Sequence, residues 1–178
     1  RDLRQVVGRD VRAHSDRDPR RAVHQQTREA RRQHDRLLAA ASARRDRLPL
    51  FVSGDLHATA AGRIHRSGEL DLSANPPVSV LAGTPGTGAW GWPSVFRGTP
   101  PRPSRTVEAE EWIAPVEENG FTVADFTPEG VRLAFFRWKP DDGVAAIDAL
   151  EPFRVLELAL PGARAGRGAL PGRPGEMP

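Results

Sequence analysis

Residues 50–57 have the sequence LFVSGDLH, in which a short apolar run opens into a polar loop. The apolar residues 50–52 are typical of a buried strand, and the serine and glycine that follow end it. Upstream, residues 20–46 carry apolar and small side chains at helical spacing, with an arginine-rich opposite face. These residues are predicted to form a helix that begins near Pro19. A helix followed by a buried strand predicts an α/β fold with a mixed β-sheet and flanking helices.

Other segments add to this pattern. Two β-rich runs on either side of Pro128 and Gly130 predict a hairpin, because proline and glycine at these positions favour a turn. An acidic segment that contains Pro115 is expected to be partly helical. The segment GRIHRSG, residues 62–68, is expected to be a loop. The further predicted strands are residues 78–82, 121–126, 131–138 and 153–160, and the acidic segment is residues 108–118.

Composition excludes several classes of protein. The 178 residues contain no cysteine, which excludes disulfides, thiolate metal sites and a cysteine nucleophile. No run of 18 apolar residues occurs, so no membrane-spanning helix is expected.

We predict an unassigned basic arm at residues 1–19, a folded region at residues 20–160 and a disordered tail rich in glycine and proline at residues 161–178.

The N-terminal region is basic, with 14 arginines against 7 acidic residues in positions 1–47. Such a segment can bind nucleic acid through phosphate neutralisation. However, acidic residues are interleaved throughout, and no aromatic residue that could stack on a base precedes Phe51. Nucleic-acid binding is therefore an alternative that we do not favour, and a non-catalytic binding module is another.

Asp55 and His57 are the strongest candidates for chemistry. They follow a buried strand, where open α/β sheets place their ligands, and their spacing lets both side chains reach one cation. A carboxylate and a neutral imidazole suit manganese, iron or zinc. Downstream, His65 with Arg63 beside it could contact a phosphate. The structural alternatives are a hydrogen-bonded Asp–His pair in the loop and a plain surface loop around His65.

The glycine-rich loop GTPGTGAWGWPS, residues 83–94, formally matches a dinucleotide-binding fingerprint at Gly86, Gly88 and Gly91. We reject that interpretation, because the fingerprint requires a helix directly after the glycines and the chain continues with Trp92 and Pro93. The loop could still form one wall of a site. Neither a P-loop nor a nucleophile-elbow serine is present.

The ordered set of these segments resembles the C-terminal part of PhoD-like alkaline phosphatases, in the calcineurin-like metallophosphoesterase superfamily. The resemblance is carried by LPLFVSGDLHA, NPPVSVLAGTPGTG, GWPSVFRG, EENGFTVADFTPEGVRLAFFRWKPDDG and IDALEPFRVLEL. It implies part of an αββα sandwich, and a metal-dependent phosphoric ester hydrolase acting on a phosphate ester. In that family a two-metal site binds divalent or trivalent ions, here manganese, iron, calcium or zinc.

By this resemblance, residues 54–57 (GDLH) are the closing metal motif of the family. His57 is then a metal ligand, and Asp55 is a ligand or a group in contact with the phosphate; both are the expected catalytic residues. The family's other motifs, G-D-x-x-D and G-N-H, are missing from residues 1–50 and from residues 58–178. The chain is therefore expected to be an incomplete part of the domain, with its independent activity in doubt.

Overall fold

The computed structural model describes residues 19–88, 90–99, 101–102 and 104–162, and within them the side chains from residue 28 onward. The chain divides into two compact units, residues 1–38 and 39–178. The predicted arm and tail lie outside the described residues, apart from Pro19, Pro161 and Gly162.

Helix α1, Pro19–Ser42, confirms the predicted helix and ends four residues before the expected boundary at residue 46. The turn that follows is held by Asn75. Its Nδ2 atom lies 3.3, 3.0 and 3.2 Å from the carbonyl oxygens of Ser42, Arg44 and Arg47. This side chain thus fixes the turn, and it donates to the Ser42 carbonyl, which the helix end leaves without a partner inside the helix.

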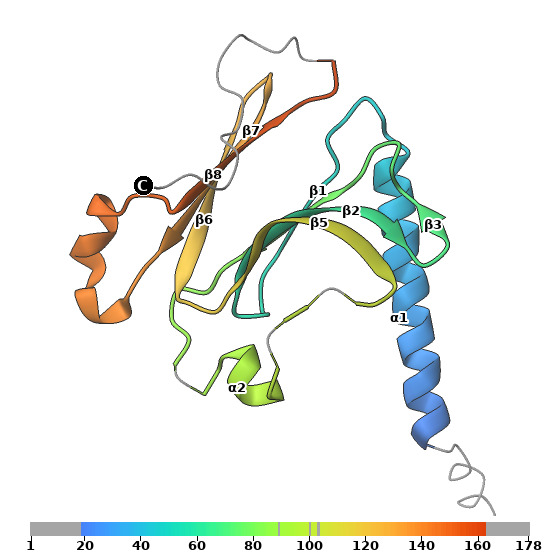
Figure 1. The fold of residues 1–178 in the computed structure, drawn as a ribbon, viewed down its shortest axis with the longest axis horizontal. Coiled ribbons are helices and arrows are strands. Elements are labelled where there is room, and N and C mark those ends of the chain that lie inside the picture. The colour runs from blue at the N-terminus through green and yellow to red at the C-terminus, as the bar shows by residue number, and fades with distance from the viewer. Residues whose placement is uncertain (1–18, 89, 100, 103, 163–178) are drawn as a thin grey trace, which may run out of the picture. The chain divides into compact units, whose positions relative to one another are not determined.

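The first sheet has five strands in the order β1, β4, β2 and β3, with β5 also paired to β2 (Figure 1). Strands β1 and β4 are parallel, and the other pairs are antiparallel. The sheet is therefore mixed, as predicted for the α/β class. Its strands are β1 (Leu50–Ser53), β2 (Thr59–Ser67), β3 (Leu70–Asp71), β4 (Val78–Ala82) and β5 (Val107–Val116).

The β2–β5 pair is curled, because its register shifts at three places. A Cβ atom added to Gly62 would lie 2.4 Å from the carbonyl oxygen of Glu110, so this close approach of the two backbones requires glycine. Bulges of this kind bend a strand and increase its twist. Figure 1 shows β5 arching across β2.

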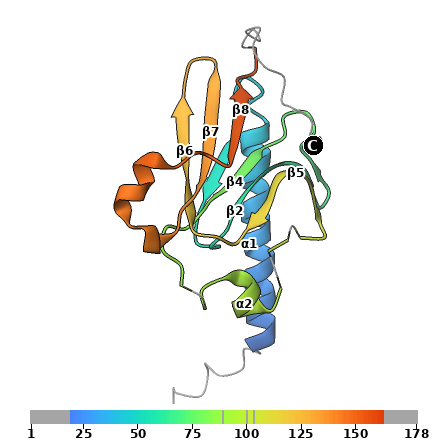
Figure 2. The same ribbon diagram turned by 60° about the vertical axis from the view of Figure 1, so that its left-hand side comes forward.

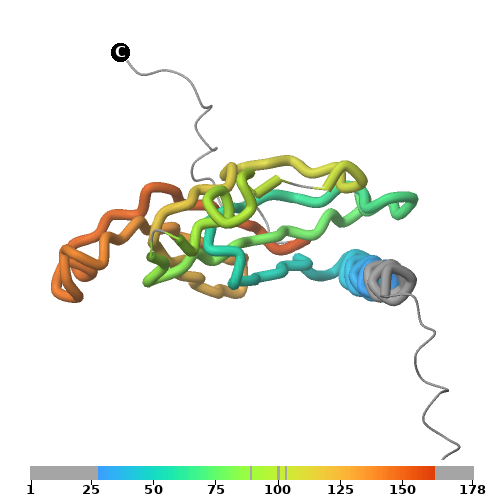
Figure 3. The backbone as a smooth tube through the Cα atoms, turned by 90° about the horizontal axis from the view of Figure 1, so that it is seen from below, coloured from blue at the N-terminus to red at the C-terminus, as the bar shows by residue number. Residues whose placement is uncertain are grey.

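The second sheet is antiparallel, in the order β6, β7 and β8. Strands β6 (Gly120–Phe126) and β7 (Gly130–Arg137) confirm the predicted hairpin, and β8 (Arg154–Ala159) confirms the last predicted strand. Two 3₁₀ helices, η1 (Pro140–Asp142) and η2 (Val144–Ala149), join β7 to β8. They lie away from both sheets, at the left in Figures 1 and 3.

The two sheets share one apolar core. Figure 2 shows the two sheets next to each other. Alternate residues of β7 face it, and Leu133 and Phe135 are completely buried there. Burial of one such side chain stabilises a fold by roughly 1.5–3 kcal/mol. The cluster consists of Ala61, Val78, Val80 and Ile113 from the first sheet and Val131, Leu133, Phe135 and Leu158 from the second.

Two predictions of local structure are wrong. The acidic segment, expected to be partly helical, is strand β5, and the expected loop at residues 62–68 lies mostly in β2. Basic and acidic side chains face each other across the pair: Arg66 Nε lies 3.3 Å from Glu108 Oε2, and His65 Nε2 lies 3.7 Å from Glu110 Oε2. Pairing between distant segments therefore overrides the local preferences.

Among the described residues, no helix is both long enough and apolar enough to cross a membrane.

Candidate functional site

The parallel pairing of β1 and β4 brings two loops together at one edge of the first sheet. Leu50 is paired with Val78 and Ser53 with Leu81, so both strands end at the same level. The loop after β1 contains Asp55 and His57, and the loop after β4 is the glycine-rich segment. The carboxyl ends of adjacent parallel strands are the usual location of ligands in such sheets.

The loop after β1 has an unusual backbone. Asp55 and His57 have φ angles of 66° and 51°, in the left-handed region, and the Leu56 amide donates a hydrogen bond of 2.8 Å to the Gly54 carbonyl. A left-handed conformation costs most L-residues about 1–2 kcal/mol, although Asp and His adopt it more often than most. Such strain concentrates at functional sites, so the outlier itself points to this loop.

His57 is fixed by one hydrogen bond to the second loop. Its Nδ1 atom lies 2.7 Å from the carbonyl oxygen of Gly91 and, because that oxygen can only accept, Nδ1–H is the donor. The neutral ring then has its lone pair on Nε2. Histidines that bind metals are commonly held in this way, with one ring N–H donated to a backbone carbonyl.

The glycine-rich loop is held in turn by Asn119. The Thr87 amide donates to Asn119 Oδ1 at 2.7 Å, and Asn119 Nδ2 donates to the Thr87 carbonyl at 3.1 Å. A Cβ atom on Gly91 would lie 2.7 Å from Thr87 Cγ2 and 3.4 Å from His57 Nδ1. Glycine at position 91 therefore allows the loop to pass close to the histidine ring.

A short helix, α2 (Pro93–Arg97), follows this loop and was not predicted. Both the amide and the hydroxyl of Ser94 donate hydrogen bonds to the carboxylate of Glu117, the amide at 2.8 Å. This carboxylate occupies the start of the helix, where the dinucleotide fingerprint would place a phosphate. A helix does follow the glycines, so that ground for rejecting the fingerprint is wrong, but the Glu117 carboxylate takes the position that a phosphate would need.

A pocket of about 240 Å³ lies between the two loops and α2. Its lining includes Asp55, His57 and Arg97. Within the described ranges, neither Asp55 nor Arg97 forms an ion pair. The other lining residues are Leu56, Trp90, Gly91, Pro93 and Phe96.

Arg63 and His65, which the sequence suggested as phosphate contacts, lie elsewhere. His65 is six residues into β2 and about 20 Å from its start at the rise of an extended strand, where it faces Glu110. The Arg63 guanidinium lies over the Trp112 ring, 4.9 Å from its centroid. The structure therefore does not bring either residue to Asp55 and His57.

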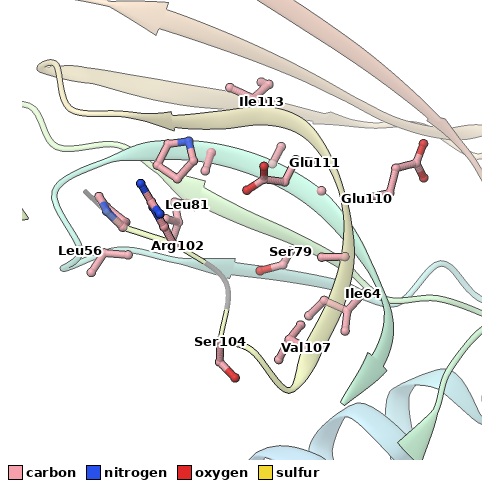
Figure 4. A pocket seen from close by; sticks show the side chains of 16 residues that line it. Leu56, Ile64, Ser79, Leu81, Arg102, Ser104, Val107, Glu110, Glu111 and Ile113 are labelled. Atoms are coloured by element: carbon pink, nitrogen blue, oxygen red, sulfur yellow. The ribbon is translucent and has the colours of Figure 1, made fainter. Parts of the chain in front are cut away.

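Leu56 lines the pocket with Asp55 and His57 and a second pocket as well. It lines a second, apolar groove of about 250 Å³ on the sheet face opposite the core (Figure 4). Figure 4 shows Leu81 near Leu56, with Ile64 and Val107 at the far end of the groove.

Two residues were missed as candidates: Arg97 and Phe96, both on α2. The sequence feature that could have identified them is the pair of apolar runs at residues 50–52 and 78–82, each followed by a loop. The two runs pair in parallel, and this pairing brings the second loop to the first.

The site thus combines one carboxylate, one imidazole with a fixed tautomer and one guanidinium. These groups can hold a cation and an anion bound to it. Among the described residues no cluster of three or more His, Cys, Asp or Glu side chains occurs. Comparisons with models of protein families, with curated proteins and with solved structures find no match to this chain.

Proposed function

We propose that this chain provides the closing metal-site loop of a metal-dependent phosphoric ester hydrolase of the PhoD-like kind. The observation that supports this most directly is the 2.7 Å hydrogen bond from His57 Nδ1 to the Gly91 carbonyl. It directs the Nε2 lone pair away from the second loop. A plain Asp–His loop pair would use this imidazole to bind Asp55, and no such bond is formed.

Asp55 and His57 are the proposed ligands, for manganese, iron, calcium or zinc. Their donor atoms fit: an imidazole nitrogen and a carboxylate oxygen suit the first-row ions among these, and the backbone turn at Gly54 leaves the loop open to solvent. When bound, a pair of metal ions polarises the phosphoryl group and makes a water molecule more acidic. Asp55 and His57 would hold that pair on one side.

Arg97 takes the role that the sequence suggested for Arg63 and His65. It lines the pocket with Asp55 and His57. A guanidinium binds two phosphate oxygens at once, which orients the ester and balances its charge. The phosphate would therefore lie between Arg97 and the two ligands.

The remaining ligands of a two-metal site have to come from a polypeptide segment other than the described one. We propose that the two packed sheets correspond to the inner layers of an αββα sandwich. Strand β1 ends the order of the first sheet, so a further strand can pair with it. A parallel strand at that edge would deliver its own loop next to Asp55.

The test is NMR with substoichiometric Mn²⁺, which broadens the signals of nearby amides. We expect broadening at residues 54–58 and at Gly91, its loss in His57→Ala, and its retention in His34→Ala. His34 is a suitable control because it lies on α1, outside the proposed metal-site loop in sequence, where its Nδ1 atom is 3.4 Å from Asp35 Oδ1. Broadening that is absent, or unchanged in His57→Ala, would disprove the metal site.

Turnover is the second measurement. The chain is expected to hydrolyse bis(4-nitrophenyl) phosphate with Mn²⁺ only after a segment with the missing ligands is added. Turnover by the chain alone that disappears in His57→Ala would show that the ligand set is complete. Salt-dependent binding of DNA, abolished by deletion of residues 1–47, would instead favour the nucleic-acid alternative.

A further inference from the structure

We propose that Trp90 and Phe96 form a subsite for an aromatic ring on the alcohol side of the phosphate ester. The substrate class is then an aryl phosphate or a nucleotide rather than a phosphate ester of a simple polyol. This inference rests on the proposed function, because it places the phosphate itself between Arg97, Asp55 and His57.

The first argument is exposure. The side chains of Trp90 and Phe96 are 85% and 82% exposed, the highest values among the exposed large hydrophobic residues of the described chain. Both line the pocket that contains Asp55 and His57. Large aromatic rings are normally buried, and exposed ones mark sites of interaction.

The second argument is that both rings are attached to a fixed backbone. Trp90 directly precedes Gly91, whose carbonyl accepts the hydrogen bond from His57. The Phe96 amide donates to the Trp92 carbonyl at 2.9 Å, and α2 is held at its start by a buried Pro93 and by the bond from Ser94 to Glu117. A ring on a held backbone loses less conformational entropy when a ligand stacks on it.

The third argument is the combination of chemistry in the pocket. Arg97 is adjacent to Phe96 in sequence and lines the same pocket. One element therefore presents a cation for phosphate and a ring for an apolar group. Stacking on such rings accepts any planar group, so the subsite selects aromatic alcohols as a class.

In the reaction that this binding mode serves, the P–O bond to the aromatic alcohol breaks. Water provides the hydroxyl that remains on phosphorus, and a proton goes to the departing oxygen. No oxidant or further reactant is needed.

The experiment compares phenylphosphonate with methylphosphonate by isothermal titration calorimetry, with and without Mn²⁺. Neither compound contains an ester bond that hydrolysis could break. We expect phenylphosphonate to bind about tenfold more tightly, near the lower limit of what one stacking contact provides. Trp90→Ala and Phe96→Ala should each reduce the ratio of the two affinities, phenylphosphonate over methylphosphonate, severalfold. Neither substitution should change the affinity for methylphosphonate.

Phe126→Ala is the matched control, since Phe126 is 72% exposed on β6 and does not line this pocket. Its ratio should equal that of the unmodified protein. A ratio below twofold, no binding of phenylphosphonate, or a ratio unchanged in both ring variants would overturn the proposal. The proposal would also be overturned if the protein formed a dimer that either ring substitution dissociates, because the rings would then form a contact between two chains.

Failure of the proposed function looks different. If His57→Ala and the removal of Mn²⁺ leave the affinities for both phosphonates unchanged, the metal site is wrong. A retained preference for the phenyl compound would then still support the aromatic subsite.

Discussion

The side chain of His57 and the backbone of Gly91 are joined by a 2.7 Å hydrogen bond, although 34 residues separate them in the sequence. The bond links the loops that follow two parallel strands. It holds the imidazole in one tautomer and keeps the second loop beside it. The properties of the candidate site therefore depend on a glycine that contributes no side chain.

Gly91→Ala is expected to damage the site while leaving the fold intact. The added methyl group would lie 2.7 Å from Thr87 Cγ2 and 3.4 Å from His57 Nδ1, so the loop has to move. We expect the Mn²⁺-induced broadening at His57 to weaken and the free energy of unfolding to fall by about 1 kcal/mol. Gly88→Ala is the control, because a Cβ atom there meets nothing within 4 Å. Equal effects of both substitutions would contradict this account.

Asp55→Gly is expected to stabilise the protein and weaken metal binding. Asp55 has a φ of 66°, which glycine adopts without strain. Relief of this strain exceeds the extra entropy of glycine in the unfolded chain, so stability should rise by roughly 0.5 kcal/mol. Thermal unfolding and the Mn²⁺ experiment measure the two effects. A lower melting temperature would show that the loop is not strained at Asp55.

Asn75→Ala is expected to destabilise the end of α1. The Nδ2 group of Asn75 lies within 3.3 Å of three carbonyl oxygens, and its loss leaves them without this donor. The expected decrease in the free energy of unfolding is about 1–3 kcal/mol, measured by urea denaturation. Asn75→Asp, which keeps the shape but removes the donor, should cause a similar loss. A stable Asp variant would mean that the shape of the side chain matters more than its hydrogen bonds.

Leu133→Ala tests the shared core of the two sheets. Leu133 is 0% exposed and belongs to the cluster that joins them. The substitution should lower the free energy of unfolding by about 2–5 kcal/mol, since it leaves a cavity. Val144→Ala, at a position 75% exposed on η2, should have little effect. If both variants unfold at the same urea concentration, the sheets do not share the core described above.

Asp71 provides a prediction about pH. Hydrogen bonding from Ser73, above all from its backbone amide at 2.9 Å, lowers the pKa of the Asp71 carboxyl below its ordinary value. A carboxyl with a lowered pKa stabilises the folded state above its unfolded pKa, and this contribution is lost as the pH falls through the lowered value. An NMR titration should place Asp71 below the usual range of aspartates. Asp71→Asn should remove this pH dependence.

Local sequence was sufficient for several elements. The hairpin of β6 and β7 follows from two β-rich runs around Pro128 and Gly130, because a tight turn places the two runs side by side. The short strands β1 and β4 follow from their mainly apolar runs. The position of Asp55 and His57 after an apolar run was enough to select them as candidates. The prediction that this run is a buried strand is wrong, since β1 lies at the edge of the first sheet and Val52 is 56% exposed.

Pairing between distant segments decided the rest. Strands β2 and β5 are too polar to be recognised alone, and each forms because its backbone pairs with the other. The same holds for the site: Arg97 and Phe96 join Asp55 only because β1 and β4 run in parallel and end together. Sequence alone thus determined the elements whose hydrogen bonds and apolar contacts are close along the chain. Only the tertiary structure decided which distant segments supply the remaining partners, because that choice depends on contacts that no local pattern contains.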